Sequence, residues 1–336
     1  MKAIVVNETS PTRELTIQDV AEPVPGPEDV CIKVYAAGVN RADLLQRAGK
    51  YPPPPGTSPI LGLEVSGEII EVGSRVTTWR PGMKVCALLS GGGYAEKTVA
   101  HAGSVIPLPA RASFVEGAAI PEAFITAFTN LFFEANLRTG ESVLIHGGSS
   151  GVGTAAIQLA RAVGARVAVT VGTEEKAARC EDLGADKAVV YRDADFVEEV
   201  RSWAGGFGVD VVLDCIGSDY LSGNLAVLGI GGRVVVIGTM SGARSEVDLA
   251  TLMRKRARLI GSVLRPRTPL EKADLVRLFM ERFWSFLEFR KIYPVIHETF
   301  LMHEVARAHD VMKASTHIGK LIITINTDNN EDELIS

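Results

Sequence analysis

The sequence contains few of the features that mark secreted, membrane or nucleic-acid-binding proteins. Its four cysteines, Cys31, Cys86, Cys180 and Cys215, are far apart and form no Cys-x-x-Cys pair. This spacing favours reduced thiols in a cytoplasmic protein. No apolar run approaches the roughly 20 residues of a membrane span, and the start of the chain lacks the apolar segment of a signal peptide. The formal net charge is -5, so there is no basic excess for nucleic acid. We therefore expect neither membrane nor nucleic acid as a partner.

The composition and the first third of the chain indicate a globular protein that begins with a β-rich domain. The 336 residues are 46% hydrophobic and 22% charged, enough for two domains with sizeable cores. Segments Lys2–Val6, Val30–Ala36 and Glu64–Val72 are rich in β-branched residues and are bounded by Pro, Gly and Asp, which predicts strands. The proline run Pro52–Gly56 predicts a surface loop, because proline has no N–H to donate.

From about Ala118 the pattern changes to apolar strands that alternate with amphipathic helices. The predicted strands are Ser142–Ile145, Arg166–Val171, Ala188–Tyr191, Val209–Cys215, Arg233–Ile237 and Leu259–Leu264, and the predicted helices among them include Gly151–Val163 and Glu174–Leu183. Strands separated by helices of this length form right-handed βαβ units and a parallel sheet. We therefore predict an α/β fold with a doubly wound, Rossmann-type parallel sheet.

The end of the chain is expected to return to the first domain. A helix over Leu270–Phe289 repeats apolar residues every three or four positions, so one face is buried. Strands then follow at Val295–Phe300 and Lys320–Ile325, and we expect them to complete the N-terminal β-domain, which makes that domain discontinuous. The predicted limits are 1–122 and 266–326 for the β-domain, 123–265 for the Rossmann domain, and 327–336 for an acidic, disordered tail.

A glycine-rich turn marks the expected dinucleotide site. The strand that ends at His146 leads into Gly148-x-x-Gly151-x-Gly153, and a helix begins there. We assign Gly148 to the tight turn, Gly151 to close approach of a pyrophosphate and Gly153 to close packing of helix on strand. The N-terminus of the helix supplies N–H groups and partial positive charge for phosphate.

The next strand indicates a preference for NADPH. Dinucleotide sites that prefer NAD place a carboxylate at its tip to bind the ribose 2′-hydroxyl. Here the tip is Gly172-Thr173, which would not repel a 2′-phosphate, and Lys176 follows within one helical turn. Tyr191, at the end of the third strand, can donate a hydrogen bond beside it. Glu174 and Glu175 are a rival signal, although acidic residues are also favoured in the first turn of a helix.

Several motifs resemble one family over nearly the whole chain. They are Asn40–Leu44, Tyr51 with the prolines after it, Ile60–Glu64, Ala119–Ala123, His146–Gly153, Leu213–Gly217 and Ile318–Lys320. The chain resembles the zinc-free quinone oxidoreductases of the medium-chain dehydrogenase/reductase superfamily, most of all an NADPH-dependent branch. The resemblance implies a GroES-like β-domain beside a Rossmann domain, an active site in the cleft between them, and homodimers that pair the edge strand Leu259–Leu264.

The resemblance also implies roles for individual residues. Asn40 and Thr126 would line the nicotinamide side, and Tyr51 would lie over the quinone; these three are the candidate catalytic residues. Thr173 falls where relatives often have serine. The further cofactor contacts implied by the resemblance or by the glycine-rich turn are Gly148, Ser150, Gly151, Val152, Gly153, Gly172, Lys176, Tyr191, Cys215, Ile216, Gly217, Val263, Leu264, Arg265 and Lys320.

The residues at the zinc positions do not favour metal chemistry. Zinc alcohol dehydrogenases need a thiolate where this chain has Asn40 and an imidazole where it has Leu63, and neither residue replaces the missing ligand. We therefore expect no metal site. His303 and His309 are expected at the surface or as capping residues, and His146 is expected to be structural.

Three functions are left open by the sequence. For quinone reduction, aligned rings and exclusion of water suffice, because the quinol oxygens can take protons from solvent. Reduction of an enone or enoyl thioester would need a proton donor and a basic groove, which Arg265 and Arg267 leave possible. The third function is NADPH binding without turnover. We expect a small quinone as the substrate.

Overall fold

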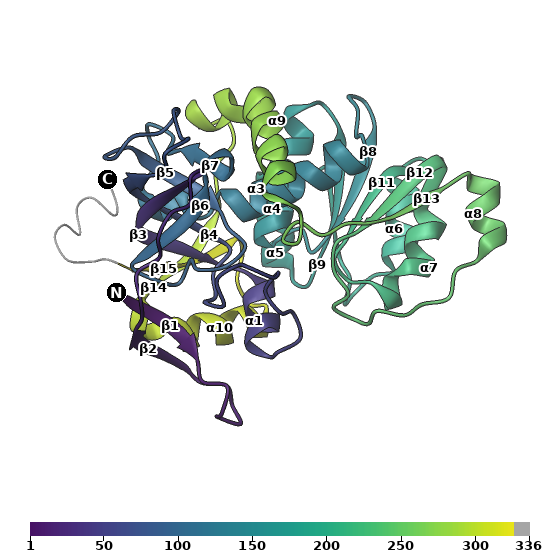
Figure 1. The fold of residues 1–336 in the computed structure, drawn as a ribbon. Coiled ribbons are helices and arrows are strands. Elements are labelled where there is room, and N and C mark those ends of the chain that lie inside the picture. Colours follow the sequence, from purple (N-terminus) through teal and green to yellow (C-terminus); the bar gives the residue numbers. More distant parts are fainter. Residues whose placement is uncertain (326–336) are drawn as a thin grey trace. The chain divides into compact units, whose positions relative to one another are not determined.

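The computed structural model describes residues 1–325, which form two compact units with separate sheets (Figure 1). The first unit contains Met1–Ile125 and the chain from Leu264 onward, and the second contains Thr126–Val263. The first unit is therefore discontinuous in sequence, as expected. The tail predicted to be disordered, 327–336, lies outside the described residues. Within the described part of the chain, no helix is both long and apolar enough to cross a membrane.

The second unit is built on a six-stranded parallel sheet. Its strands are β8 (Ser142–His146), β9 (Arg166–Val171), β10 (Lys187–Val190), β11 (Val209–Asp214), β12 (Leu228–Val236) and β13 (Arg258–Gly261). The strand order is β10-β9-β8-β11-β12-β13, and every neighbouring pair is parallel. The order reverses between β8 and β11, so this is the predicted doubly wound fold with its switch point beside the glycine-rich turn.

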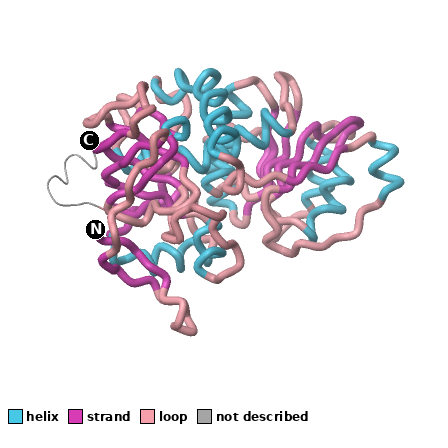
Figure 2. The backbone as a smooth tube through the Cα atoms, in the orientation of Figure 1, coloured by secondary structure: helices cyan, strands magenta, loops and turns pink. Residues whose placement is uncertain are grey.

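Helices cover both faces of this sheet, as a parallel sheet requires. They are α4 (Gly151–Ala162), α5 (Glu174–Asp182), α6 (Phe196–Trp203), α7 (Ser218–Val227) and α8 (Leu249–Lys255). Leu144 and Val212 of the sheet share one core with Val200 of α6 and Leu225 of α7. Figures 1 and 2 show α4 and α5 on the opposite side of the strands from α6 and α7. Each fully buried Val or Leu contributes roughly 1.5–3 kcal/mol, so this double layer dominates the stability of the unit.

The last strand is shorter than the sequence pattern predicts. β13 ends at Gly261, whereas the prediction extended to Leu264. Ser262 donates its backbone N–H to Val236, and after that bond the chain leaves the sheet. Leu264 already belongs to the first unit. The apolar pattern continued past the strand because Leu264 is buried, at 8% exposure.

The first unit contains the GroES-like domain. Its strands are β1 (Lys2–Val6), β2 (Leu15–Asp19), β3 (Asp29–Val39), β4 (Glu64–Val72), β5 (Lys84–Leu88), β6 (Lys97–His101), β7 (Val105–Pro107), β14 (Ile296–Leu301) and β15 (Lys320–Thr324). The main sheet has the order β14-β15-β3-β4-β5-β7, with β6 also paired to β3. β15 pairs antiparallel with β3, Leu321 opposite Val39, so the end of the chain completes a sheet that its beginning started.

Helices place the functional segments of this unit. They are α1 (Arg41–Arg47), α2 (Phe114–Gly117), α3 (Pro121–Phe128), α9 (Pro269–Glu288) and α10 (Val305–Ala314). α3 continues across the boundary at Ile125 into the second unit. α1 begins at the end of β3, and α3 is followed by a π-helical segment, Thr129–Glu134. Ile4, Ile32 and Phe300 form part of a core between the sheet and α10.

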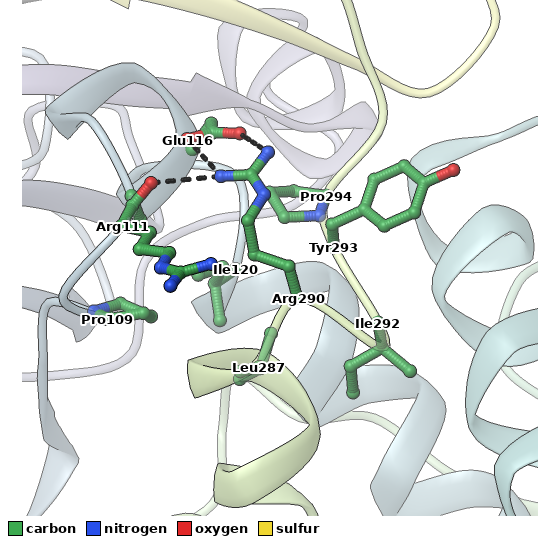
Figure 3. Close-up of a pocket in the computed structure, with 10 residues that line it drawn as sticks. Pro109, Arg111, Glu116, Ile120, Leu287, Arg290, Ile292, Tyr293 and Pro294 are labelled. Atoms are coloured by element: carbon green, nitrogen blue, oxygen red, sulfur yellow. Dashed lines mark hydrogen bonds and ion pairs between the residues drawn. The ribbon is translucent and has the colours of Figure 1, made fainter. Parts of the chain in front are cut away.

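The end of α9 is fastened to α2 by an arginine with a left-handed backbone conformation. Arg290, with a φ of +53°, donates to the Glu116 carboxylate at 2.7 Å and to the carbonyl of Arg111 at 2.9 Å. Figure 3 shows this contact beside a small apolar pocket to which Ile120 and Leu287 contribute. The two ends of the sequence of this unit are thereby joined at a second place besides the sheet.

In the second unit, one buried arginine holds several segments together. The Arg233 side chain is 6% exposed and makes a two-pronged contact with the Glu141 carboxylate at 2.7 and 3.0 Å. Its other hydrogens go to the carbonyls of Ala135, Asn136 and Asp210. All the N–H groups of the guanidinium are thus directed at acceptors, so the turn before β8 is tied to the second half of β12.

We expect Arg233→Met to lower the free energy of unfolding by about 3 kcal/mol, because it leaves the Glu141 carboxylate and three carbonyls without their donor. Arg277→Met is the matched control, since Arg277 is half-exposed and pairs with Glu281 on the surface of α9. That control should cost less than about 1 kcal/mol. Urea unfolding measures both, and equal effects would contradict the role of Arg233.

Candidate active site

The glycine-rich turn between β8 and α4 is shaped by close packing of backbone on backbone. Gly147 has a φ of +68°, so the left-handed residue of the turn directly precedes Gly148. Gly148 is limited instead by its neighbour, because a Cβ there would meet the Val169 side chain at 2.6 Å. A Cβ on Gly153 would lie 2.3 Å from the carbonyl oxygen of Gly147. The helix can therefore begin this close to the strand only with glycine at that position.

The first turn of α4 presents N–H groups at the carboxyl end of β8. Ser150 is the N-cap, and its hydroxyl accepts from the N–H of Gly153 at 3.0 Å. Gly151 and Val152 are the first two residues of the helix, whose N–H groups have no acceptor within the helix itself. This is the geometry of a phosphate site, with donors and the positive end of the helix dipole directed at one point.

A buried chain of polar side chains links the three strand ends around this turn. His146 Nδ1 lies 2.9 Å from the Thr170 hydroxyl, and His146 Nε2 lies 2.7 Å from Asn224 Oδ1. Asn224 donates through Nδ2 to Asp214 at 3.0 Å, so its Oδ1 must accept and Nε2 of His146 must carry the hydrogen. Burial lowers the pKa of His146 to about 4, which keeps the ring neutral. The structural role predicted for His146 agrees with this network.

The same network shapes the loop after β11. Asp214 accepts from the backbone N–H of Ile216 at 2.7 Å and of Gly217 at 3.1 Å. Burial raises the pKa of Asp214, while these N–H donors oppose the shift. Cys215 lies beneath the turn, since its Sγ donates to the carbonyl of His146 at 3.4 Å. Of the predicted cofactor contacts, Cys215, Ile216 and Gly217 therefore lie next to the glycine-rich turn.

Two cations, Lys176 and Arg192, follow the ends of β9 and β10. Thr173 caps α5 by accepting from the N–H of Lys176 at 3.3 Å, and a Cβ on Gly172 would lie 3.0 Å from the Tyr191 hydroxyl. Burial lowers the pKa of Lys176, and a second cation, Arg192, lowers it further, while Glu175 opposes this. The sequence analysis missed Arg192, although it directly follows Tyr191.

In the first unit, Asn40 belongs to a buried ionic cluster. Lys320 Nζ donates to Glu64 Oε1 at 2.5 Å, to Asn40 Oδ1 at 2.7 Å and to the carbonyl of Val39 at 2.9 Å. Asn40 Nδ2 in turn donates to Glu64 Oε1 at 2.9 Å. All three hydrogens of the Lys320 ammonium thus have protein acceptors, and a contact from Lys320 to a cofactor would displace one of them. The direct effect of Lys320 is to fix the orientation of the Asn40 amide.

A second buried group lies behind Asn40. The Asp43 carboxylate accepts from the backbone N–H of Asn40 at 2.8 Å, from that of Gly62 at 3.0 Å and from the Tyr94 hydroxyl at 3.1 Å. Burial raises the pKa of Asp43 to about 6. His309, expected at the surface, is in fact 2% exposed, and its Nε2 lies 3.4 Å from the Tyr94 hydroxyl. That expectation was wrong because α10 packs its Val305, Ala308 and Met312 side into the core.

The loop that carries Tyr51 is clamped by Arg265. The Arg265 guanidinium lies 5.2 Å from the centre of the Tyr51 ring, and it donates to the carbonyls of Ser90 at 2.9 Å and Tyr51 at 3.3 Å. A further bond, 2.7 Å, goes to Gln46 Oε1, while Gln46 Nε2 holds the carbonyl of Pro59. Arg265 and Gln46 therefore hold the loop at both Tyr51 and Pro59, which limits the motion of Tyr51.

The structure adds a carboxyl that the sequence analysis did not consider. Glu122, in the first turn of α3, is partly exposed, and its backbone N–H donates to Glu64 Oε2 at 2.8 Å. Burial and the nearby Glu64 charge raise the pKa of the Glu122 carboxyl to about 8. The charge of Glu122 also acts on Tyr51 and on Arg265. The sequence signal was present, because Glu122 lies four residues before the candidate Thr126 and so on the same side of one helix.

The candidate residues divide between the two units. Asn40, Tyr51, Leu264, Arg265 and Lys320 belong to the first unit, and Thr126, Val263 and the residues of the dinucleotide turn belong to the second. Leu63, at the position where zinc enzymes have an imidazole, is a buried core residue. Among residues 1–325, no three His, Cys, Asp or Glu side chains are arranged to hold a metal ion.

Comparison with known proteins agrees with this architecture. Residues 26–110 match the alcohol dehydrogenase GroES-like domain, and residues 151–280 match the zinc-binding dehydrogenase family. The chain is 34% identical to the quinone oxidoreductase of Rattus norvegicus and 33% identical to that of Homo sapiens, covering 97% of this chain and 98% of each relative. The chain belongs to the medium-chain dehydrogenase/reductase superfamily. It is an oxidoreductase of the NAD(P)-dependent kind, which confirms the predicted fold and family.

Solved structures extend the comparison. The Escherichia coli quinone oxidoreductase complexed with NADPH has a TM-score of 0.86 at 26% identity, covering 96% of this chain and 100% of that one. The JamJ enoyl reductase has a TM-score of 0.85 at 26% identity, covering 97% of this chain and 99% of that one. A quinone oxidoreductase and an enoyl reductase therefore both share the fold over nearly the whole of this chain.

We expect Lys320→Met to lower the free energy of unfolding by about 3–5 kcal/mol, because it leaves the Glu64 carboxylate buried without its cation. Adding Glu64→Gln to Lys320→Met removes that charge and should recover a large part of the loss. Chemical unfolding of the two single variants and the double variant forms a double-mutant cycle. Strictly additive effects would show that Lys320 and Glu64 are not coupled.

Proposed function

We propose that this protein is an NADPH-dependent quinone reductase that transfers hydride from the nicotinamide to a quinone without zinc. The observation that carries the proposal is the similarity to quinone oxidoreductases over 97% of the chain. The site is compatible with it, because the dinucleotide turn and the Asn40 cluster are both intact. The same similarity favours catalysis over cofactor binding without turnover.

The choice of NADPH rests on the charges at the tips of β9 and β10. Burial lowers the pKa of Lys176, and the nearby Arg192 charge lowers it further, which shows that the two cations act on each other. The tip itself, Gly172-Thr173, carries no carboxylate. A 2′-phosphate would add negative charge beside Lys176 and Arg192 and would accept hydrogen bonds from Lys176 and Tyr191. The E. coli quinone oxidoreductase, similar in fold, was solved as an NADPH complex, which agrees with this choice.

The residues of the chain do the positioning. NADPH, when bound, supplies the hydride. The first turn of α4 and the Cys215–Gly217 loop would hold its phosphates and ribose, and Thr126 and Asn40 would line the nicotinamide side. Asn40 keeps one orientation because Lys320 and Glu64 hold both ends of its amide. Tyr51, clamped by Arg265, would stack on the quinone ring. Fixed side chains of this kind lower the entropy cost of aligning two rings.

Independence from zinc is proposed from the side chains at the ligand positions. The Asn40 amide is engaged with Lys320 and Glu64, and Leu63 offers an apolar side chain where an imidazole would be needed. A tetrahedral zinc site requires N or S ligands at these places. The nearest ammonium, that of Lys320, would also repel a divalent cation.

We also propose a homodimer in the cytoplasm. β13 is the edge of the parallel sheet, and its Leu259 is 43% exposed. An edge strand with exposed apolar side chains is a typical surface for pairing with a second copy. The four cysteines are free thiols, three of them buried, as is typical of proteins in a reducing compartment.

A second candidate function is reduction of an enone or enoyl thioester. It is favoured by the similarity in fold to the JamJ and CurK enoyl reductases, with TM-scores of 0.85 and 0.83. Both substrate classes accept hydride at a carbon conjugated to a carbonyl. A panel of quinones, enones and enoyl thioesters, assayed by NADPH oxidation in the presence of a chelator, decides between them.

We expect Lys176→Ala to weaken NADPH binding by about 10- to 100-fold and NADH binding far less. The reason is the loss of a charged hydrogen bond to the 2′-phosphate, worth roughly 1.5–3 kcal/mol. Lys187→Ala is the control, because Lys187 pairs with Glu199 in the same unit. Fluorescence titration with both cofactors measures the effect. Equal losses for NADPH and NADH would remove Lys176 from the phosphate site.

Tyr51→Ala should lower kcat/KM for quinones about tenfold or more, equivalent to roughly 1.4 kcal/mol, while NADPH affinity stays nearly unchanged. Tyr51→Phe separates stacking, which survives, from a hydrogen bond to the carbonyl, which does not. Steady-state kinetics and cofactor titration on both variants measure this. Wild-type quinone kinetics in Tyr51→Ala would place the substrate elsewhere, and a parallel loss of NADPH affinity would mean that the loop contacts the cofactor.

A further inference from the structure

Glu122 lies in the first turn of α3, where backbone N–H groups are normally free to bind a carboxyl. The N–H of Glu122 itself is taken by Glu64 Oε2 at 2.8 Å. The Glu122 carboxyl makes no hydrogen bond and no ion pair with any residue in the part of the chain that the structure describes. It is nevertheless partly exposed, so a bound molecule or water can reach it.

Lys320, a cation that acts on Glu122, already uses its hydrogens for other acceptors. Its three hydrogens go to Glu64, Asn40 and Val39, so it neutralises Glu64 and has no donor left. Glu64 in turn uses Oε1 for Lys320 and Asn40, and Oε2 for the Glu122 amide. The cluster therefore balances one carboxylate with one ammonium, and a second ionised carboxyl at Glu122 would stand against the Glu64 charge.

Lys272 and Arg265 also donate their hydrogen bonds to groups other than the Glu122 carboxyl. Lys272 of α9 donates to the Ser90 hydroxyl and to the carbonyl of Arg265 at 2.7 Å. Arg265 donates to Ser90, Tyr51 and Gln46. Burial lowers the pKa of Lys272 to about 8, with Glu122 opposing that shift, so this ammonium stays mostly protonated at pH 7, and its hydrogen bonds go to Ser90 and Arg265 rather than to Glu122. The charged and titratable groups that act on the site are Glu64, Lys320, Lys272, Asp43, Tyr51 and Arg265.

We propose that Glu122 is a catalytic residue, held as a neutral carboxylic acid, which donates the proton that accompanies hydride transfer to the substrate. This inference rests on the proposed function. It agrees with the raised pKa of the Glu122 carboxyl, about 8, which keeps the acid protonated at neutral pH. A general acid works best when its pKa lies near the working pH.

The step balances as follows. A hydride, which carries two electrons and one proton, forms a C–H bond on the electron-poor acceptor, and the cofactor is oxidised. The O–H bond of the Glu122 carboxyl breaks, and its proton goes to the oxygen or carbon that gains negative charge. The Glu122 carboxylate then takes a proton from water. One proton is consumed per turnover, as in any two-electron reduction of a quinone or an enone.

The substrate class follows from this role. A strong electrophile such as a benzoquinone yields a stable anion that solvent can protonate, so the acid gives it a small advantage. A weakly activated enone yields a basic enolate and needs the acid far more. A positioned carboxylic acid beside Tyr51 therefore widens the range of acceptors from quinones to conjugated ketones, which joins the two candidate functions in one site.

The test is Glu122→Gln, which keeps size and neutrality but cannot give up a proton. With an enone we expect kcat to fall roughly 100-fold or more, and with a benzoquinone less than about tenfold. In wild type, kcat with the enone should be constant at low pH and fall above about pH 8 as the acid ionises. This fall should be absent in Glu122→Gln. Glu71→Gln, exposed on β4, is the control and should match wild type.

Thermal unfolding gives a readout that needs no turnover. A carboxyl that titrates near 4.5 in the unfolded chain and near 8 in the native state costs stability as pH rises between these values. Glu122→Gln should therefore equal wild type near pH 4.5 and exceed it in Tm near pH 8. Equal stability at both values would show that Glu122 is ionised in the native protein and would overturn the proposal.

The outcomes separate this inference from the proposed function. Wild-type activity on quinones, together with an unchanged pH profile and rate for enones in Glu122→Gln, overturns the role of Glu122 alone. A wild-type protein that oxidises NADPH with no acceptor in the panel overturns the proposed function and proton donation with it. The selective loss with enones, together with the pH-dependent difference in Tm, supports both.

Discussion

The buried ion pair between Lys320 and Glu64 is the contact on which the first unit depends. It joins β15, from the end of the chain, to β4, and through Asn40 it reaches the start of α1. The other oxygen of Glu64 holds the start of α3. Four elements that are far apart in sequence are thereby fixed around one carboxylate. Because both partners are almost fully buried, neither can leave without a large desolvation cost to the other.

The two units hold their candidate residues in place by different kinds of interaction. In the second unit, neutral hydrogen bonds in a chain from Thr170 through His146 and Asn224 to Asp214 align strand ends that are already parallel. In the first unit, the ion pair between Lys320 of β15 and Glu64 of β4 adds to a sheet in which both strands pair with β3. A neutral network permits close approach of an anionic cofactor, whereas a charged network sets the protonation state of its neighbours. Burial raises the pKa of Asp214 in the second unit as well as the pKa values of Asp43 and Glu122 in the first.

The second unit could be predicted almost entirely from the sequence, because its signals are local. Strand, glycine turn and helix follow each other within Ser142–Ala162, and the parallel order follows from the handedness of βαβ units. Even there, the sequence analysis named Gly148 for the tight turn but did not name Gly147. Gly147 and Gly148 are both required, one for its backbone angle and the other for the Val169 side chain on a neighbouring strand. The constraint on Gly148 depends on the position of β9, which carries Val169 and which the sequence alone does not place.

The first unit was harder because its site is assembled from distant segments. The resemblance pointed to Asn40, Tyr51 and Lys320, but not to Glu64 as the acceptor between them or to Glu122 beside it. His309 shows the same limit, since a histidine in an amphipathic helix gives no sign of a tyrosine partner 215 residues away. Tertiary packing decides which charged groups are buried. A single sequence shows the acidic residues but not the partners that surround them.

The discontinuity of the first unit has a consequence for how the chain is made. A ribosome releases β3 and β4 early, but the strand that pairs with Val39 of β3 and the ammonium that neutralises Glu64 arrive only with Lys320–Thr324. The second unit, contiguous from Thr126 to Val263, can fold before synthesis ends. During that interval the edge of β3 lacks its partner strand and the Glu64 carboxylate lacks its ammonium. Chains cut short before Lys320 would therefore carry a folded nucleotide domain beside an incomplete and aggregation-prone sheet.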